Sequence, residues 1–246
     1  MPDIMILRFD APMVSFGGVL VDAYGVTRDF PSCSMLTGLL GNALGMDHRD
    51  ADRLEALQRR LIYAVRCDVP GEILRDYQTV DLSQPFLKQG WTTRGTVQGR
   101  VGAEATRTGT HIRYRDYIAN SVYTVALTLV PESAAPDLHR IEEALRDPAR
   151  PLFIGRKPCL PAAPLLAARI QAEVKREGFV DSPLTLRQTL IDFPAVSRAA
   201  GEGRFRIWYP AAGPHEIGAL PLTDHRDWRN QIHVGRRFYK EELFGG

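Results

Sequence analysis

Residues 30–45 read FPSCSMLTGLLGNALG, and this stretch predicts the first helix of the chain. A proline and two serines near its start favour helix initiation. Apolar side chains then recur at helical spacing, and Gly45 ends the pattern. A helix with such a face must bury it against another element. The fold therefore depends on the segments that flank this one.

The flanking segments alternate between strand-like and helical patterns. The predicted strands are 4–9, 62–68, 117–130 and 151–155, and the further predicted helices are 50–60 and 136–146. Taken in order, they give strand, helical region, strand, strand, helical region, strand. This is the β-α-β-β-α-β arrangement of a ferredoxin-like fold, so we expect the α+β class.

A long segment at about 80–113 interrupts this order at the middle hairpin. It contains six glycines or prolines and shows no hydrophobic periodicity. Such segments are uncommon in compact domains unless they are functional or disordered, and we interpret this one as an inserted arm. Residues 1–160 are then expected to form the ferredoxin-like domain with its arm. Residues 161–246 read as a smaller β-rich C-terminal part.

The overall composition excludes several classes of protein. Hydrophobic residues make up 44% and charged residues 24% of the 246 positions, which is typical of a globular protein. The chain contains no apolar run long enough to span a bilayer, and its start does not read as a secretory signal. Three widely spaced cysteines exclude a dense disulfide scaffold and the usual zinc spacings. We expect a cytoplasmic protein without metal or cofactor.

Positive charge is concentrated in two segments. Residues 88–117 and 226–240 each carry a net charge of +4, whereas the whole chain carries only +2. Neither segment reads as an amphipathic helix, so a polyanion is a better partner for them than a membrane surface. Clustered arginines favour phosphate groups, which their planar donors bind in pairs.

The common catalytic motifs are absent from the sequence. It contains no phosphate-binding loop, no dinucleotide-binding glycine pattern, no zinc-protease motif and no nucleophile elbow. Asp224 and His225, with Asn230 and His233, form the one cluster with a nuclease-like composition. We prefer to interpret it as a solvated basic loop around Trp228.

A metal-free ribonuclease is an alternative that the residues leave open. Such an enzyme needs a general base, an acid and a cation for the phosphorane, and His111, Arg113 and Tyr114 lie together in the sequence. We favour a phosphate or base contact for these residues. A third hypothesis is a protein-only scaffold with solvated basic segments.

Several segments together resemble the fifth family of CRISPR-associated proteins, the CasD-like subunits of type I-E Cascade surveillance complexes. The matching segments are 6–8 with 11–13 and 15–17, 30–45 with 49–50, 64–68, 75–80, 115–117 leading into 122–129, and 155–161. They extend in order from residue 4 to about residue 165. The resemblance implies a ferredoxin-like body, similar to an RNA-recognition motif, with a thumb-like insertion.

The same resemblance implies a role in antiviral defence. Its members grip the 5′ handle of the CRISPR RNA and cap one end of a backbone filament, without catalysis. The implied partners are the CRISPR RNA, the backbone and large subunits, and, indirectly, target DNA. In a sister subtype the related protein processes the RNA itself, so a metal-independent endoribonuclease remains the alternative function.

The candidate RNA-binding residues come from the first basic segment, from the start of the first helix and from the pair that follows the predicted strand at 151–155. The N–H groups of a helix N-terminus favour anions, so we expect phosphates beside the two serines there. Arginines and one lysine would supply the charge. The candidates are Arg28, Ser32, Ser34, Arg94, Arg107, Arg113, Arg115, Arg156 and Lys157.

Overall fold

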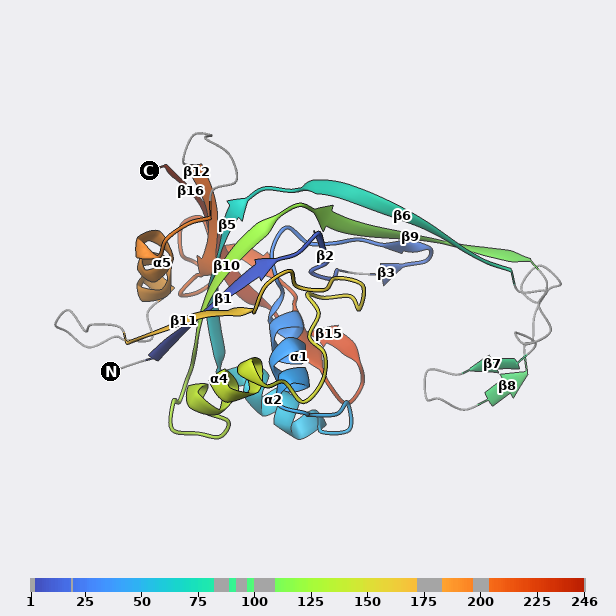
Figure 1. The fold of residues 1–246 in the computed structure, drawn as a ribbon, viewed down its shortest axis with the longest axis horizontal. Helices are drawn as coiled ribbons and strands as arrows, with labels where there is room; N and C mark the ends of the chain where they lie inside the picture. Colours follow the sequence, from blue (N-terminus) through green and yellow to red (C-terminus); the bar gives the residue numbers. More distant parts are fainter. Residues whose placement is uncertain are drawn as a thin grey trace.

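Four helices and a seven-stranded antiparallel sheet form the body of the protein among the residues described by a computed structural model (Figure 1). The described residues are 3–18, 20–81, 89–91, 97–99, 109–171, 183–196 and 204–245. The predicted α+β class is confirmed. Within these ranges, every helix is too short or too polar to cross a membrane.

The helices and strands of the described residues have the following bounds. The helices are α1 (Cys33–Ala43), α2 (Ala51–Arg60), α4 (Leu138–Arg146) and α5 (Pro183–Asp192). The main sheet contains β11 (Leu166–Gln171), β1 (Asp3–Asp10), β10 (Val122–Leu129), β5 (Leu61–Val69), β12 (Arg204–Pro210), β16 (Arg237–Gly245) and β13 (Leu220–Leu222), in that spatial order. The other strands are β2 (Met13–Val14), β3 (Leu20–Val21), β4 (Tyr24–Gly25), β6 (Glu72–Asp81), β7 (Gln89–Trp91), β8 (Val97–Gly99), β9 (Thr110–Ala119), β14 (His225–Asp227) and β15 (Ile232–Val234).

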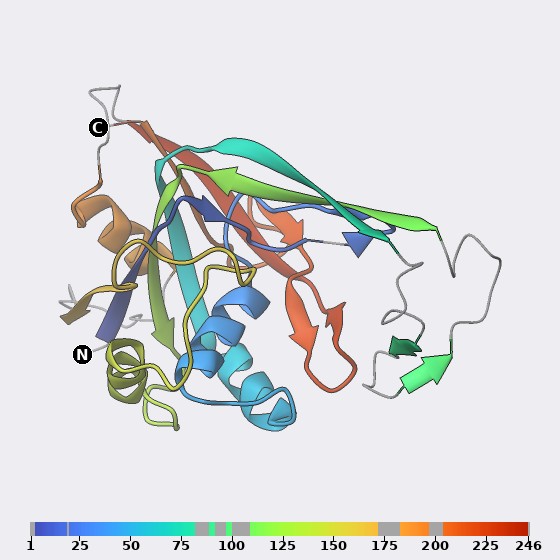
Figure 2. The same ribbon diagram turned by 45° about the vertical axis from the view of Figure 1, so that its right-hand side comes forward.

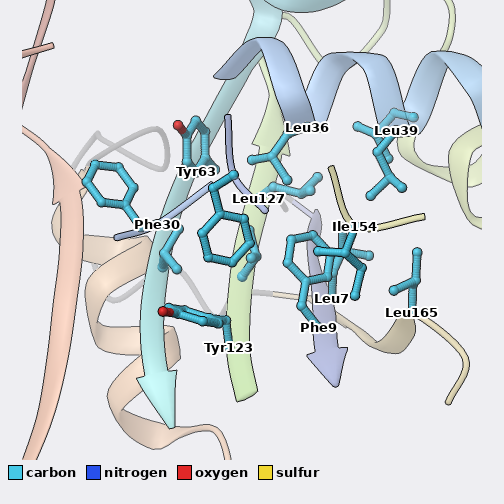
Figure 3. Packing of buried hydrophobic residues seen from close by; sticks show 14 of the residues in the cluster. Leu7, Phe9, Phe30, Leu36, Leu39, Tyr63, Tyr123, Leu127, Ile154 and Leu165 are labelled. Carbon is cyan, nitrogen blue, oxygen red and sulfur yellow. The ribbon is translucent and has the colours of Figure 1, made fainter. Parts of the chain in front are cut away.

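Both faces of the main sheet are covered, which explains why β1 is almost continuously apolar. Leu7 and Phe9 belong to the larger core, which α1 and α4 cover (Figure 3). Ile4 and Ile6 point to the opposite face, where they pack with residues of α5 such as Leu190. Successive strand residues point to opposite faces, so a strand buried on both sides needs apolar residues throughout.

A buried ion pair joins α5 to the main sheet. Arg66 and Asp68 of β5 have side-chain exposures of 2% and 0% and are joined by a bond of 2.5 Å. Arg66 also donates to the carbonyl oxygens of Leu190 and, at 2.8 Å, Phe193. Buried charges are tolerated only when they are paired and hydrogen-bonded. The bonds of Arg66 to Asp68 and to the two carbonyl groups supply this pairing and fix the end of α5.

The strand predicted at 117–130 is two strands, so that prediction is wrong. β9 ends at Ala119 and β10 begins at Val122. Between them, Asn120 has a φ of 59°, in the left-handed region that asparagine tolerates. Only Asn120 and Ser121 interrupt the apolar residues on the two sides of this turn, and the sequence analysis read the strand across them.

The segment predicted as an arm, 80–113, is flanked by the two strands of a long hairpin, and most of the segment lies outside the described residues. β6 pairs with β9 at ten successive positions, from Glu72 opposite Ala119 to Asp81 opposite Thr110. Sequence analysis missed β6 because the strand is exposed along nearly its whole length and lacks the alternation that marks a half-buried strand. Beyond the hairpin, β7 and β8 pair with each other.

The predicted strand at 151–155 is also wrong, because these residues form a loop. Their backbone groups form hydrogen bonds to other loop residues rather than to a neighbouring strand. For example, the Ile154 N–H donates to the Cys159 carbonyl oxygen at 2.8 Å. The strand that pairs with the outer side of β1 is instead β11. The main sheet thus contains strands from both sides of residue 160, and the division into two parts at that position stays a prediction.

Candidate functional site

A groove of about 1070 Å³ lies beside α1, between the loop at 15–18, the loop at 150–160 and the β14–β15 hairpin. Five of the nine candidate residues line it: Arg28, Ser32, Ser34, Arg156 and Lys157. They come from two separate stretches of the chain, 28–34 and 156–157, and the fold brings them to one surface.

Further charged and polar side chains line the same groove and were not among the candidates. These are Asp47, His48, Arg150, Arg226 and His233. The groove therefore has five cationic side chains and one carboxylate among its lining residues, which favours a polyanion. The charge of segment 226–240 was a signal for Arg226, whereas nothing in the sequence pointed to Arg150.

The N-terminus of α1 does not offer free N–H groups to a phosphate. The Cys33 N–H donates to the Asp224 carboxylate at 2.7 Å, and the Ser34 N–H donates to the Asp224 carbonyl at 3.1 Å. The Met35 N–H donates to the Ser32 hydroxyl at 3.2 Å. The prediction that these backbone groups bind RNA phosphates is wrong for this structure, because residues of the protein itself occupy them.

Asp224 is a structural residue rather than part of a nuclease centre. Its carboxylate accepts two hydrogen bonds of 2.8 Å from Arg237 and one of 3.2 Å from the Tyr63 hydroxyl. Burial disfavours the charged carboxylate, but the bonds and charge of Arg237 outweigh it and hold the pKa of Asp224 below its usual value. The network clamps the chain before β14 onto the start of α1.

The predicted solvated loop around Trp228 is confirmed only in part, because residues 229–236 are exposed whereas Trp228 itself is buried. Trp228 is 5% exposed and packs with Met46 and Leu54 in a small core of its own. The neighbouring His225 is half-buried, which lowers its pKa. This packing holds the β14–β15 hairpin against α1 and α2, where it forms one wall of the groove.

Arg156 and Lys157 have different environments although they are adjacent. The Arg156 guanidinium donates to the carbonyl oxygens of Gly25 at 2.8 Å and Asp116 at 3.0 Å, and it lies 4.9 Å from the centre of the Tyr117 ring. Lys157 is exposed and has no hydrogen-bond or ion-pair partner among the described residues. Lys157 is therefore the cation of the pair that is free to bind a ligand.

The other candidate arginines lie in several places. Arg28 donates to the Thr223 carbonyl at 3.0 Å and lines the groove. Arg113 and Arg115 project from β9 and donate to the carbonyls of the 22–23 turn at 3.0 and 3.4 Å, outside the groove lining. Arg94 and Arg107 lie outside the described residues.

The residues considered for a metal-free ribonuclease do not converge. His111 and Tyr114 are separated by three positions along β9, so their side chains point to opposite faces of the strand. Tyr114 stacks on Tyr24 with ring centres 4.9 Å apart. Among the described residues there is also no group of three histidine, cysteine or acidic side chains arranged for a metal ion.

Comparisons with known proteins agree with the sequence resemblance. The family model of the CRISPR-associated protein Cas5 matches residues 4–240. The CRISPR system Cascade subunit CasD of Escherichia coli (strain K12) is 31% identical over 177 residues, which are 72% of this chain and 75% of the relative.

Solved structures share the fold. A chain of a CRISPR RNA-guided surveillance complex superposes with a TM-score of 0.68 at 23% sequence identity. The match covers 98% of the present chain and 90% of the chain from the complex. A crystal structure of a Cas protein gives 0.60 at 20% identity, with coverages of 98% and 95%. The resemblance expected from the sequence is confirmed, and this chain belongs to the Cas5 family of CRISPR-associated proteins.

Proposed function

We propose that this protein is the subunit of a CRISPR surveillance complex that binds the 5′ handle of the CRISPR RNA in the groove beside α1. The observation that carries the proposal is the convergence of five cations on one groove of about 1070 Å³, in a member of the Cas5 family. The protein caps one end of the backbone filament and contacts the backbone and large subunits. Its relation to target DNA is indirect, through the RNA.

The strand order supports a ferredoxin-like body for this subunit. The four strands β11, β1, β10 and β5 are neighbours and antiparallel, with α1 and α2 between β1 and β5 and with α4 between β10 and β11. That connection is β-α-β-β-α-β, as in RNA-recognition motifs. The fourth strand of the unit is then β11.

Side chains rather than backbone groups bind the phosphates in this proposal, because the N–H groups of α1 are already hydrogen-bonded. Phosphate contacts position a nucleic acid, whereas contacts to base edges give sequence preference. The arginines and Lys157 serve the first role. His48 and His233, which line the same groove, are placed for the second.

Replacing Lys157 with alanine is expected to weaken binding of the handle RNA several-fold without changing stability. Each phosphate contact to a single strand contributes roughly 0.7 to the slope of log affinity against log salt, so the slope should become shallower by about that amount. The measurement is RNA binding by fluorescence anisotropy over a series of salt concentrations.

Lys240→Ala is the matched control, since Lys240 is paired with Glu216 at 3.0 Å and lies outside the groove lining. An unchanged slope in Lys157→Ala would exclude Lys157 from the site. Arg156→Ala is unsuitable for this test, because it would also remove hydrogen bonds that hold the chain near Gly25.

The proposal includes the absence of catalysis. We expect the purified protein to bind repeat RNA without cutting it, in EDTA or in magnesium, because metal-free cleavage needs a positioned base and acid and His111 and Tyr114 diverge. Gel analysis of labelled RNA after long incubation provides the measurement. Cleavage at one repeat position that His111→Ala abolishes would instead support the endoribonuclease alternative.

The proposed location is the cytoplasm. Cys33, Cys67 and Cys159 are free and buried, which is usual for proteins of reducing compartments. Burial raises the pKa of the Cys33 thiol to about 12, so this group stays protonated.

A further inference from the structure

The β6–β9 hairpin extends away from the body of the protein (Figure 2). A row of three tyrosines crosses this hairpin and the neighbouring strand β4. Tyr114 of β9 lies directly opposite Tyr77 of β6 on one side and Tyr24 of β4 on the other. The Tyr24 and Tyr114 rings are stacked, with centres 4.9 Å apart and planes at 10°, and the Tyr77 ring lies 5.5 Å from that of Tyr114. These contacts show that the three side chains share one face of the sheet.

This face is apolar and open to solvent. Tyr77 is 55% and Tyr24 48% exposed, and Ile73 and Ile112, which alternate onto the same face, are 64% and 39% exposed. We call these four residues together with Tyr114 the tyrosine face. Contiguous exposed apolar side chains of this kind mark interaction sites on proteins.

The charges around the tyrosine face argue against a nucleic acid as its partner. Arg75 is the one cation that β6 and β9 place on this face among their described residues, and Asp116 neutralises it through two bonds of 2.7 and 3.0 Å. Sites that stack single-stranded bases combine aromatic rings with cations for the phosphates. Here Arg113 and Arg115 project from the opposite face of β9.

The opposite face of the hairpin is the one turned toward the groove. Tyr117 lies on that face, next to Leu74 in the register, and its ring is covered by Arg156, which lines the groove. The hairpin thus separates the proposed RNA site from the tyrosine face. An RNA bound in the groove leaves the tyrosines uncovered.

We infer that the tyrosine face docks an apolar surface of a neighbouring protein subunit in the surveillance complex. The inference rests on the proposed function, which places this chain in such a complex. Tyrosines are enriched among the residues that dominate binding energy at protein interfaces, because they bury a large area and lose few rotatable bonds. The ten paired positions of the hairpin and the stacked rings present these side chains in a fixed arrangement.

Tyr77→Lys tests the inference because it separates the two kinds of partner. A lysine would block an apolar protein contact but would preserve or strengthen a contact with RNA. We expect its incorporation into the complex, reconstituted with CRISPR RNA and the cognate subunits, to fall at least tenfold. RNA binding by the isolated chain should stay within twofold of the wild type.

Three further variants control the experiment. Ile73→Lys should reproduce the loss without disturbing the stacked rings, so a folding defect in one variant does not decide the result. Tyr77→Phe should retain incorporation, since it keeps the ring. Ile217→Lys places the same charge on an apolar residue that is 92% exposed and outside the tyrosine face, and it should have no effect.

Wild-type incorporation of Ile73→Lys and Tyr77→Lys would overturn the inference while leaving the proposed function intact. Loss of RNA binding by the isolated Tyr77→Ala chain would overturn it in favour of base stacking. A homodimer that Tyr77→Lys dissociates would overturn it in favour of a second copy. If the wild-type chain itself failed to enter the complex, the proposed function would be wrong as well.

Discussion

Asp224→Asn is expected to destabilise the protein by about 3–5 kcal/mol, the usual cost of leaving a buried charge without its partner. The unpaired group would be Arg237, whose side chain is only 18% exposed and which donates to both carboxylate oxygens of Asp224. For a chain of this size the melting temperature should fall by roughly 6–20 °C. Differential scanning calorimetry provides the measurement.

The same variant should also change how the folding stability depends on pH under acidic conditions. The pKa of Asp224 is depressed below its ordinary 3.8, so the wild-type carboxylate contributes its full stabilisation above about that pH. The contribution is lost as pH falls through the folded-state pKa. Asp224→Asn lacks this titration, and the difference in stability between the two proteins should shrink as the pH is lowered below 3.8.

A double variant separates charge from shape. Asp224→Asn combined with Arg237→Met should recover part of the lost stability, because it removes the buried charge that the single variant leaves without a partner. A single variant as stable as the wild type would show that the network around Cys33 and Tyr63 does not depend on the ion pair.

Gly155→Ala is expected to cost between about 2 and 6 kcal/mol, from backbone strain and overpacking together. Gly155 has a φ of +94°, and a Cβ atom there would lie 1.5 Å from the carbonyl oxygen of Ser15. That neighbour is backbone, so it has no alternative rotamer. Both residues line the groove, and the substitution should therefore push two of its walls apart.

Gly213→Ala is the matched control for this substitution. A Cβ atom at Gly213 would have no neighbour within 4 Å, and its φ is not positive, so the change should stay within about 0.5 kcal/mol. Chemical denaturation of the three proteins gives the comparison. Equal stability of Gly155→Ala and Gly213→Ala would refute the close approach of the two loops.

The elements that sequence analysis predicted well carry their signals locally. The first strand is apolar because it is buried on both faces. Ser32 caps the N-terminus of α1, and its hydroxyl accepts the Met35 N–H at 3.2 Å. Helix spacing likewise located α2 and α4. Each of these patterns arises within one or two turns of chain, so no distant residue is needed to recognise it.

The missed elements depend on pairing between distant segments. β6 is exposed along nearly its whole length, and its backbone hydrogen bonds go to β9, which begins about thirty residues after β6 ends. A strand of this kind has no apolar pattern of its own. The candidate site shows the same limit, since Arg150 joins the groove only through the position of its loop.

By itself, the sequence determined the family and the α+β class, because these follow from local patterns, and it singled out five of the residues that line the groove. The tertiary structure alone decided which groups are free to bind. Asp224 lies 191 positions from Cys33, yet its carboxylate occupies the helix N–H that would otherwise attract a phosphate. A backbone N–H that donates to a group of the protein itself is no longer free for a ligand. Which group it bonds to depends on the fold, and neither Cys33 nor Asp224 reveals this from its own sequence context.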